Sequence, residues 1–179
     1  FGRCNGVNAG VIEAFEKGIV TSASLMVRGN AASEAAEYVR MHPELSLGIH
    51  IDLGEWIFRN GEWSTLYEVI SRDDESEVRS EVAGQLDTFR RLMDRQPTHL
   101  DSHQHVHEKE PAHSIIRELA ERLRIPCRGY SAVRYCGKFY GQTATGKACH
   151  EAISVEALLN LIGTLPEGFT ELACHPGIR

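Results

Sequence analysis

Apolar residues recur along the chain at two spacings, which predict alternating helices and strands. Helical spacing predicts helices over residues 8–17, 31–41, 76–95, 112–123 and 155–165. Short runs rich in β-branched or small residues predict strands over 19–27, 46–53, 98–107, 125–128 and 169–174. Because parallel strands need crossover connections, this alternation predicts an α/β fold around a parallel sheet, either open or closed into a barrel. In both forms functional residues gather at the carboxyl ends of the strands.

Two segments lack a clear period and are predicted to be loops. The polar loop after residue 53 carries Trp56, Phe58 and Trp63, whose rings either stack on a sugar or pack on the body of the domain. The loop over 129–150 carries Arg134. Arg134 is a candidate contact for an anionic or hydroxylated substrate, and the alternative is a solvated surface charge.

Length and composition fit one soluble domain over residues 1–179, with 42% hydrophobic and 25% charged residues. A net charge of −6 argues against nucleic acid and anionic membrane as partners. No apolar run is long enough to cross a bilayer. The five cysteines form no CxxC pair, which indicates reduced thiols that serve as small apolar fillers and predicts a cytoplasmic protein.

Histidines are concentrated between Pro97 and His107. Alternate side chains of a strand share a face, so an extended segment would align one carboxylate with four imidazoles: His99, Asp101, His103, His105 and His107. Such polar groups are costly to bury without partners, and a divalent metal takes these donors as ligands. The alternative is a histidine-rich surface loop.

Two other strand ends also carry histidine. His50 and Asp52 share one face of their strand, and His175 lies where Pro176 ends the last strand. A single strand histidine is usually a hydrogen-bonded core residue, but three at equivalent positions of separate β/α units predict one shared site.

These segments resemble the YdjC-like carbohydrate deacetylases. The resemblance rests on four motifs, which are Thr21-Ser22-Ala23-Ser24, Gly48-Ile49-His50-Ile51, the segment Pro97–His107 and Cys174-His175-Pro176-Gly177. It implies a distorted parallel β/α barrel of the TIM-like type. Phe1-Gly2 is similar to the end of the family's Asp-Asp-Phe-Gly motif, so both aspartates would precede residue 1. We therefore expect a barrel truncated at both ends.

The resemblance also implies a metal-dependent hydrolase that removes an N-acetyl group from an acetylated amino sugar or oligosaccharide. A divalent metal, Mg²⁺ first and Zn²⁺ second, would be held by His50, His103 and an aspartate before residue 1. The other aspartate would be the general base. His175 is the candidate general acid, and Asp101 would orient a neighbouring imidazole. His105 is a candidate substrate contact. His105 and His107 are expected either to face the substrate or to be structural, and neither is expected to bind the metal.

Two other functions stay open. One is a different metal hydrolase, an amidohydrolase or a phosphoesterase, and the other is a non-catalytic metal- or sugar-binding module. The expected partner is a small acetylated sugar, and a homodimer also stays open.

Overall fold

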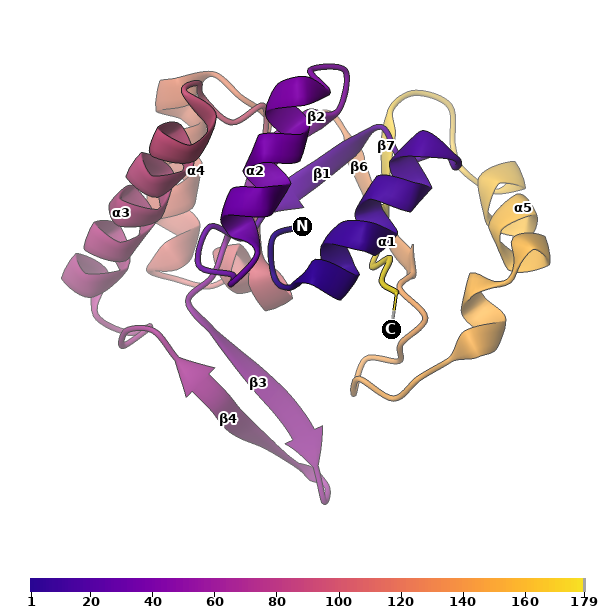
Figure 1. The fold of residues 1–179 in the computed structure, drawn as a ribbon. Coiled ribbons are helices and arrows are strands. Elements are labelled where there is room, and N and C mark those ends of the chain that lie inside the picture. The colour runs from indigo at the N-terminus through magenta and orange to yellow at the C-terminus, as the bar shows by residue number, and fades with distance from the viewer. Residues whose placement is uncertain (179) are drawn as a thin grey trace.

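The computed structural model describes residues 1–178, which form a mixed α/β fold (Figure 1). The helices are α1 (Asn5–Glu16), α2 (Ala32–Met41), α3 (Glu75–Met93), α4 (Ala112–Leu123) and α5 (Val155–Gly163), with 3-10 helices η1 (His103–Glu108) and η2 (His150–Ile153). The strands are β1 (Ser22–Leu25), β2 (Ser46–Ile51), β3 (Gly54–Arg59), β4 (Glu62–Glu68), β5 (Leu100–Ser102), β6 (Arg134–Phe139) and β7 (Thr170–Cys174). Within the described chain, every helix is too short or too polar to span a bilayer.

The parallel strands are divided between two small sheets. The first has the order β1-β2-β5, and its edge continues to Cys127 through a parallel bridge with Leu100. The second pairs β6 with β7 in parallel. The prediction of parallel strands joined by helices is confirmed, although the sheets are small and the predicted strand over 125–128 contributes only this bridge.

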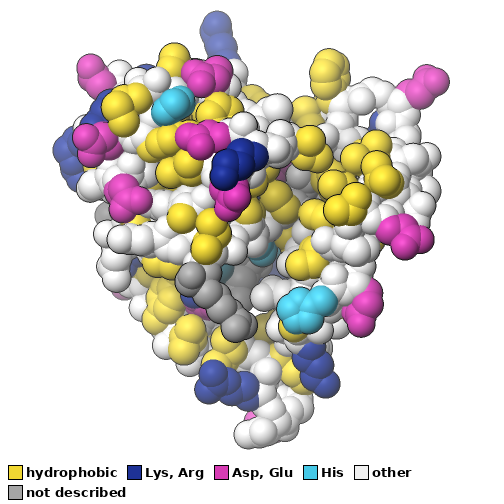
Figure 2. All heavy atoms as spheres, turned by 45° about the vertical axis from the view of Figure 1, so that its right-hand side comes forward, with side chains coloured by type: hydrophobic (Ala, Val, Ile, Leu, Met, Phe, Trp, Pro, Cys, Tyr) yellow, Lys and Arg dark blue, Asp and Glu magenta, His cyan; other side chains and the backbone are white. Residues whose placement is uncertain are grey.

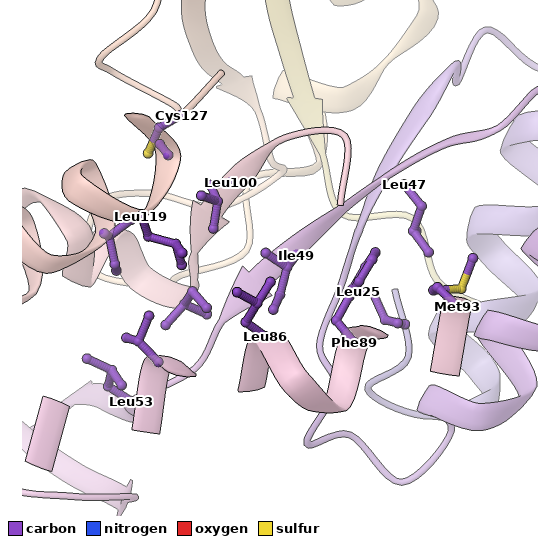
Figure 3. Packing of buried hydrophobic residues seen from close by; sticks show 14 of the residues in the cluster. Leu25, Leu47, Ile49, Leu53, Leu86, Phe89, Met93, Leu100, Leu119 and Cys127 are labelled. Carbon is purple, nitrogen blue, oxygen red and sulfur yellow. The ribbon is translucent and has the colours of Figure 1, made fainter. Parts of the chain in front are cut away.

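The core lies between the first sheet and the helices that cover it. Leu25, Leu47, Ile49 and Leu100 of the strands form one buried cluster with Leu86 and Phe89 of α3 (Figure 3). The predicted apolar stripe of α3 is buried, with Val78, Val82, Leu86, Phe89 and Met93 all at most 4% exposed. Asp74 caps this helix, because its carboxylate accepts hydrogen bonds from the backbone N–H groups of Ser76 and Glu77.

The prediction of a polar loop after residue 53 is wrong, because β3 and β4 form an antiparallel hairpin there. The hairpin extends away from the body of the molecule in Figure 1. Its turn is Asn60-Gly61, with φ of 55° and 88°, which is the residue pair that a two-residue type I′ hairpin prefers. Trp63 pairs across the strands with Phe58 and is 57% exposed.

The predicted loop over 129–150 contains strand β6, so that prediction is also wrong in part. The C-terminal third of the chain is less buried than the rest, and α5 leaves Val155 and Leu159 75% and 64% exposed. Figure 2 shows hydrophobic side chains gathered on the side of the molecule that α5 occupies. The five cysteines are free, and Cys127 is the one that is fully buried, so the interpretation as buried fillers holds only for that residue.

Candidate functional site

The histidine-rich segment does not continue as a strand. Strand β5 ends at Ser102, and the chain then turns through Gln104 and His105, whose φ angles of 48° and 56° lie in the left-handed region. Two consecutive residues in that region cannot belong to a strand. The prediction that the imidazoles from His99 to His107 share one face is therefore wrong. His103 lies beside His50, whereas His105 and His107 lie beside each other.

His50 and Asp101 form the centre of the site. They are partners in the parallel register of β2 and β5, and His50 Nδ1 donates to Asp101 Oδ1 at 2.8 Å. Ser24 Oγ donates to the other carboxylate oxygen at 3.1 Å, and Arg128 Nη2 lies 2.5 Å from it. Burial alone would raise the pKa of Asp101, but His50 and Arg128 outweigh burial and hold that pKa well below its usual range. Asp101 therefore stays ionised and fixes His50 with Nε2 free.

His103 is the first residue of η1 and lies beside His50, with ring centroids 5.7 Å apart. Its Nε2 is buried and has no hydrogen-bond partner in the part of the chain that the structure describes. The nearest carboxylate is Glu55, at 3.7 Å, beyond hydrogen-bond length. Burial and then the neighbouring His50 lower the pKa of His103 to about 4, so its imidazole is neutral at pH 7.

His175 follows β7 and completes the group of imidazoles. Its ring stacks on Tyr140 with centroids 4.2 Å apart and an interplanar angle of 6°. Burial, and then the nearby His50 and His103, lower the pKa of His175 to about 4. The structure thus brings together the three histidines that the sequence placed at separate strand ends.

Arg128 was not predicted as a site residue. It ion-pairs with Asp101 of β5 and Glu171 of β7, and its guanidinium lies 4.7 Å from the centroid of the Tyr135 ring. Burial would lower the pKa of Arg128, but Glu171 and Asp101 raise it, so the guanidinium stays charged. The signal that could have revealed it is its position directly after the short apolar run Ile125-Pro126-Cys127, at a strand end.

The remaining predicted residues lie at the edge of this group or away from it. His105 Nε2 is 3.4 Å from the Tyr135 hydroxyl, and the fully buried His107 is bonded through Nδ1 to Ser102 Oγ. Arg134 lies at the opposite end of the strands, where it pairs with Thr170 and donates to the Glu167 carbonyl. The five residue steps from Thr170 to His175 correspond to about 16 Å of strand, so the structure does not bring Arg134 to the histidines.

The donor set at His50 and His103 fits a divalent metal. Two imidazoles lie side by side, one with Nδ1 bonded to a carboxylate and the other with a buried Nε2 that lacks a partner among residues 1–178. A carboxylate that accepts a hydrogen bond from the second ring nitrogen is the usual support of a metal-binding histidine. A third ligand, such as a carboxylate, would complete the set.

The fold and the site define an α/β protein that carries a cluster of histidines, one of them bonded to a buried carboxylate, at the carboxyl ends of parallel strands. The model of the YdjC-like protein family matches residues 1–179, and the chain belongs to that family.

Relatives with assigned names are deacetylases. The chain is 33% identical to a carbohydrate deacetylase of Geobacillus stearothermophilus, over 98% of this chain and 76% of the relative. It is 32% identical to a chitooligosaccharide deacetylase of Klebsiella pneumoniae, over 98% of this chain and 78% of that protein. A crystal structure from Enterococcus faecalis V583, of a protein proposed to cleave cellobiose-phosphate, superposes with a TM-score of 0.77 and 25% identity, covering all of this chain and 78% of the other.

Proposed function

We propose that this protein is a metal-dependent carbohydrate deacetylase, which hydrolyses the N-acetyl group of an amino sugar or of its oligosaccharide. The observation that carries the proposal is the convergence of His50, His103 and His175, with Asp101 bonded to the first. Membership of a family whose named relatives are deacetylases supports the same reaction.

His50 and His103 would hold the metal, Mg²⁺ first and Zn²⁺ second. When bound, a divalent cation supplies Lewis acidity toward the acetyl carbonyl and lowers the pKa of a water molecule. Asp101 keeps His50 in the tautomer that carries its proton on Nδ1, so Nε2 is available as a ligand. Arg128 and Ser24 hold Asp101 in turn. Contacts from three segments of the chain therefore fix the position of the His50 ring.

His175 is our candidate for the general acid that protonates the departing amine. Stacking on Tyr140 fixes the plane of its ring, and its low pKa keeps the resting imidazole neutral. It must therefore gain a proton during the reaction, and the source would be the attacking water, which releases one proton through the general base. Negative charge that develops on the acetyl oxygen would favour the protonated imidazole, which can then donate to the nitrogen.

The resemblance implies that two further aspartates would serve as the general base and the third ligand. The backbone nitrogen of Phe1 donates to the Ser24 carbonyl at 3.0 Å, and the Ser24 side chain contacts Asp101. The Phe1 amino group therefore lies close to Asp101 at the site.

The first test is acetate release from N-acetylglucosamine oligomers by the full-length protein, with and without a chelator. We expect chelation and His103→Ala each to lower acetate release at least a hundredfold, because both remove the activated water. His150→Ala is the matched control, since His150 is exposed on η2, and should leave the rate unchanged. Hydrolysis of phosphodiesters in place of acetamides would instead identify a phosphoesterase. Sugar or metal binding without turnover would identify a binding module.

The closed barrel is also part of this proposal. Arg128 connects the β1-β2-β5 sheet with the β6-β7 sheet, which supports one distorted β/α barrel containing both. A cytoplasmic location and a homodimer stay predictions.

A further inference from the structure

A second cluster of metal-binding donors lies in η1, next to the residues assigned to catalysis. His105, His107 and Glu108 each offer one ligand atom, and these atoms lie within 4.8 Å of one another. The turn at Gln104 and His105, both at positive φ, brings the two imidazoles to a ring separation of 5.9 Å. The cluster is thus a product of the same turn that ends β5.

Two nitrogens in this cluster are buried and unsatisfied. His107 is fully buried, and neither its Nε2 nor Nδ1 of His105 has a hydrogen-bond partner among residues 1–178. A buried polar atom without a partner costs about 1–3 kcal/mol. Because native proteins rarely leave such atoms unpaired, two of them beside a carboxylate indicate a ligand that the cluster accepts.

The other nitrogen of each ring is already held. His107 Nδ1 contacts Ser102 Oγ, and His105 Nε2 lies 3.4 Å from the Tyr135 hydroxyl. When these nitrogens carry the ring protons, the free nitrogens have lone pairs available to a metal. Glu108 Oε1 is 3.9 Å from His105 Nδ1, and its side chain is 62% exposed and free to move.

We infer that His105, His107 and Glu108 form a second divalent-cation site, selective for Zn²⁺ or Co²⁺ over Mg²⁺. Two imidazoles and one carboxylate are the donor set of transition metals, whereas Mg²⁺ prefers oxygen ligands. Ligand atoms about 2.0–2.2 Å from one zinc ion lie within roughly 4 Å of one another, so only a small rotation of Glu108 is needed. This site is separate from His50 and His103 and replaces the predicted role of His105 as a substrate contact.

The stoichiometry of Zn²⁺ binding by the full-length protein tests this inference, measured by equilibrium dialysis and by the visible absorption of bound Co²⁺. We expect two ions per chain, and one ion in His105→Asn and in Glu108→Gln. Asparagine tolerates the left-handed conformation of residue 105, so this variant removes the imidazole without straining the turn. Glu37→Gln, an exposed carboxylate change on α2, should keep two ions.

A His50→Ala/His103→Ala double variant separates this site from the proposed catalytic site. It should retain one ion, which His105→Asn then removes. One ion in the wild type that is lost only in His105→Asn would support the second site and contradict the catalytic ligands. Equal stoichiometry in the wild type, His105→Asn and Glu108→Gln would overturn the inference, as would the absence of Zn²⁺ binding.

Discussion

Asp101 shows how one buried residue organises the chemistry of the site. A carboxylate that is 2% exposed would be neutral or destabilising without partners, but here it contacts an imidazole, a hydroxyl and a guanidinium. Each partner comes from a different segment of the chain. The ionised form is therefore stabilised by the tertiary fold, and it holds the ring of His50.

The substitution Asp101→Asn tests this role. The amide keeps the shape of the side chain but loses the charge that fixes the His50 tautomer, so we expect the affinity for the metal proposed at His50 and His103 to fall about tenfold to a hundredfold. The measurement is a titration with Mg²⁺ or Zn²⁺. Asp73→Asn, at an exposed position before α3, provides the control. Unchanged affinity in Asp101→Asn would show that Asp101 has only a structural role.

The sequence predicted these residues to different degrees. His50, His103 and His175 stand beside short apolar strands, so their position at the carboxyl edge could be inferred from pattern alone. Arg128 and Glu171 are 43 residues apart, and nothing in the local pattern reveals that they pair across the two sheets. Long-range ion pairs of this kind depend on the tertiary fold, which periodicity does not encode.

At the scale of elements, the missed hairpin and the broken strand have the same explanation. Local backbone conformation decided both, at Asn60-Gly61 and at Gln104-His105. The Asn-Gly pair is a recognised turn signal in the sequence, whereas Gln-His is not, so only the hairpin could have been predicted. The Gln104 side chain also joins the two features, because its amide accepts from Trp56 N and donates to Trp56 O at 2.9 and 2.8 Å.

Close backbone packing positions the segment that follows His175. A Cβ added at Gly10 of α1 would lie 2.5 Å from the backbone of Gly177, which leaves no room for a side chain. We expect Gly10→Ala to lower the free energy of unfolding by about 1–3 kcal/mol, even though alanine favours the helix. Gly84→Ala in α3 is the matched control, because nothing lies within 4 Å of its added Cβ. That variant should gain about 0.5–1 kcal/mol in urea unfolding. If Gly10→Ala left the free energy of unfolding unchanged or raised it, the close contact with Gly177 would be contradicted.

At the scale of the whole molecule, Arg128 holds the two parallel sheets together at the site. Its partner in the first sheet is Asp101, and its partner in the second is Glu171, which is 31% exposed. The β6-β7 sheet lies in the less buried C-terminal third of the chain. Because few buried contacts hold this sheet, we expect a single ion pair to matter more for its position than for that of the β1-β2-β5 sheet. This connection contributes to keeping His175 near His50 and His103.

Glu171→Gln should therefore loosen one sheet and leave the other intact. We expect the free energy of unfolding to fall by only about 1–2 kcal/mol, because solvent screens the partly exposed carboxylate. Amide hydrogen exchange should accelerate in β7 and stay unchanged in β2, since the lost charge connects the second sheet to the first. Glu167→Gln, an exposed change in the turn before β7, should alter neither strand. If exchange accelerated equally in β2 and β7, Arg128 would instead stabilise the molecule as a single cooperative unit, and the two sheets could not move independently at the site.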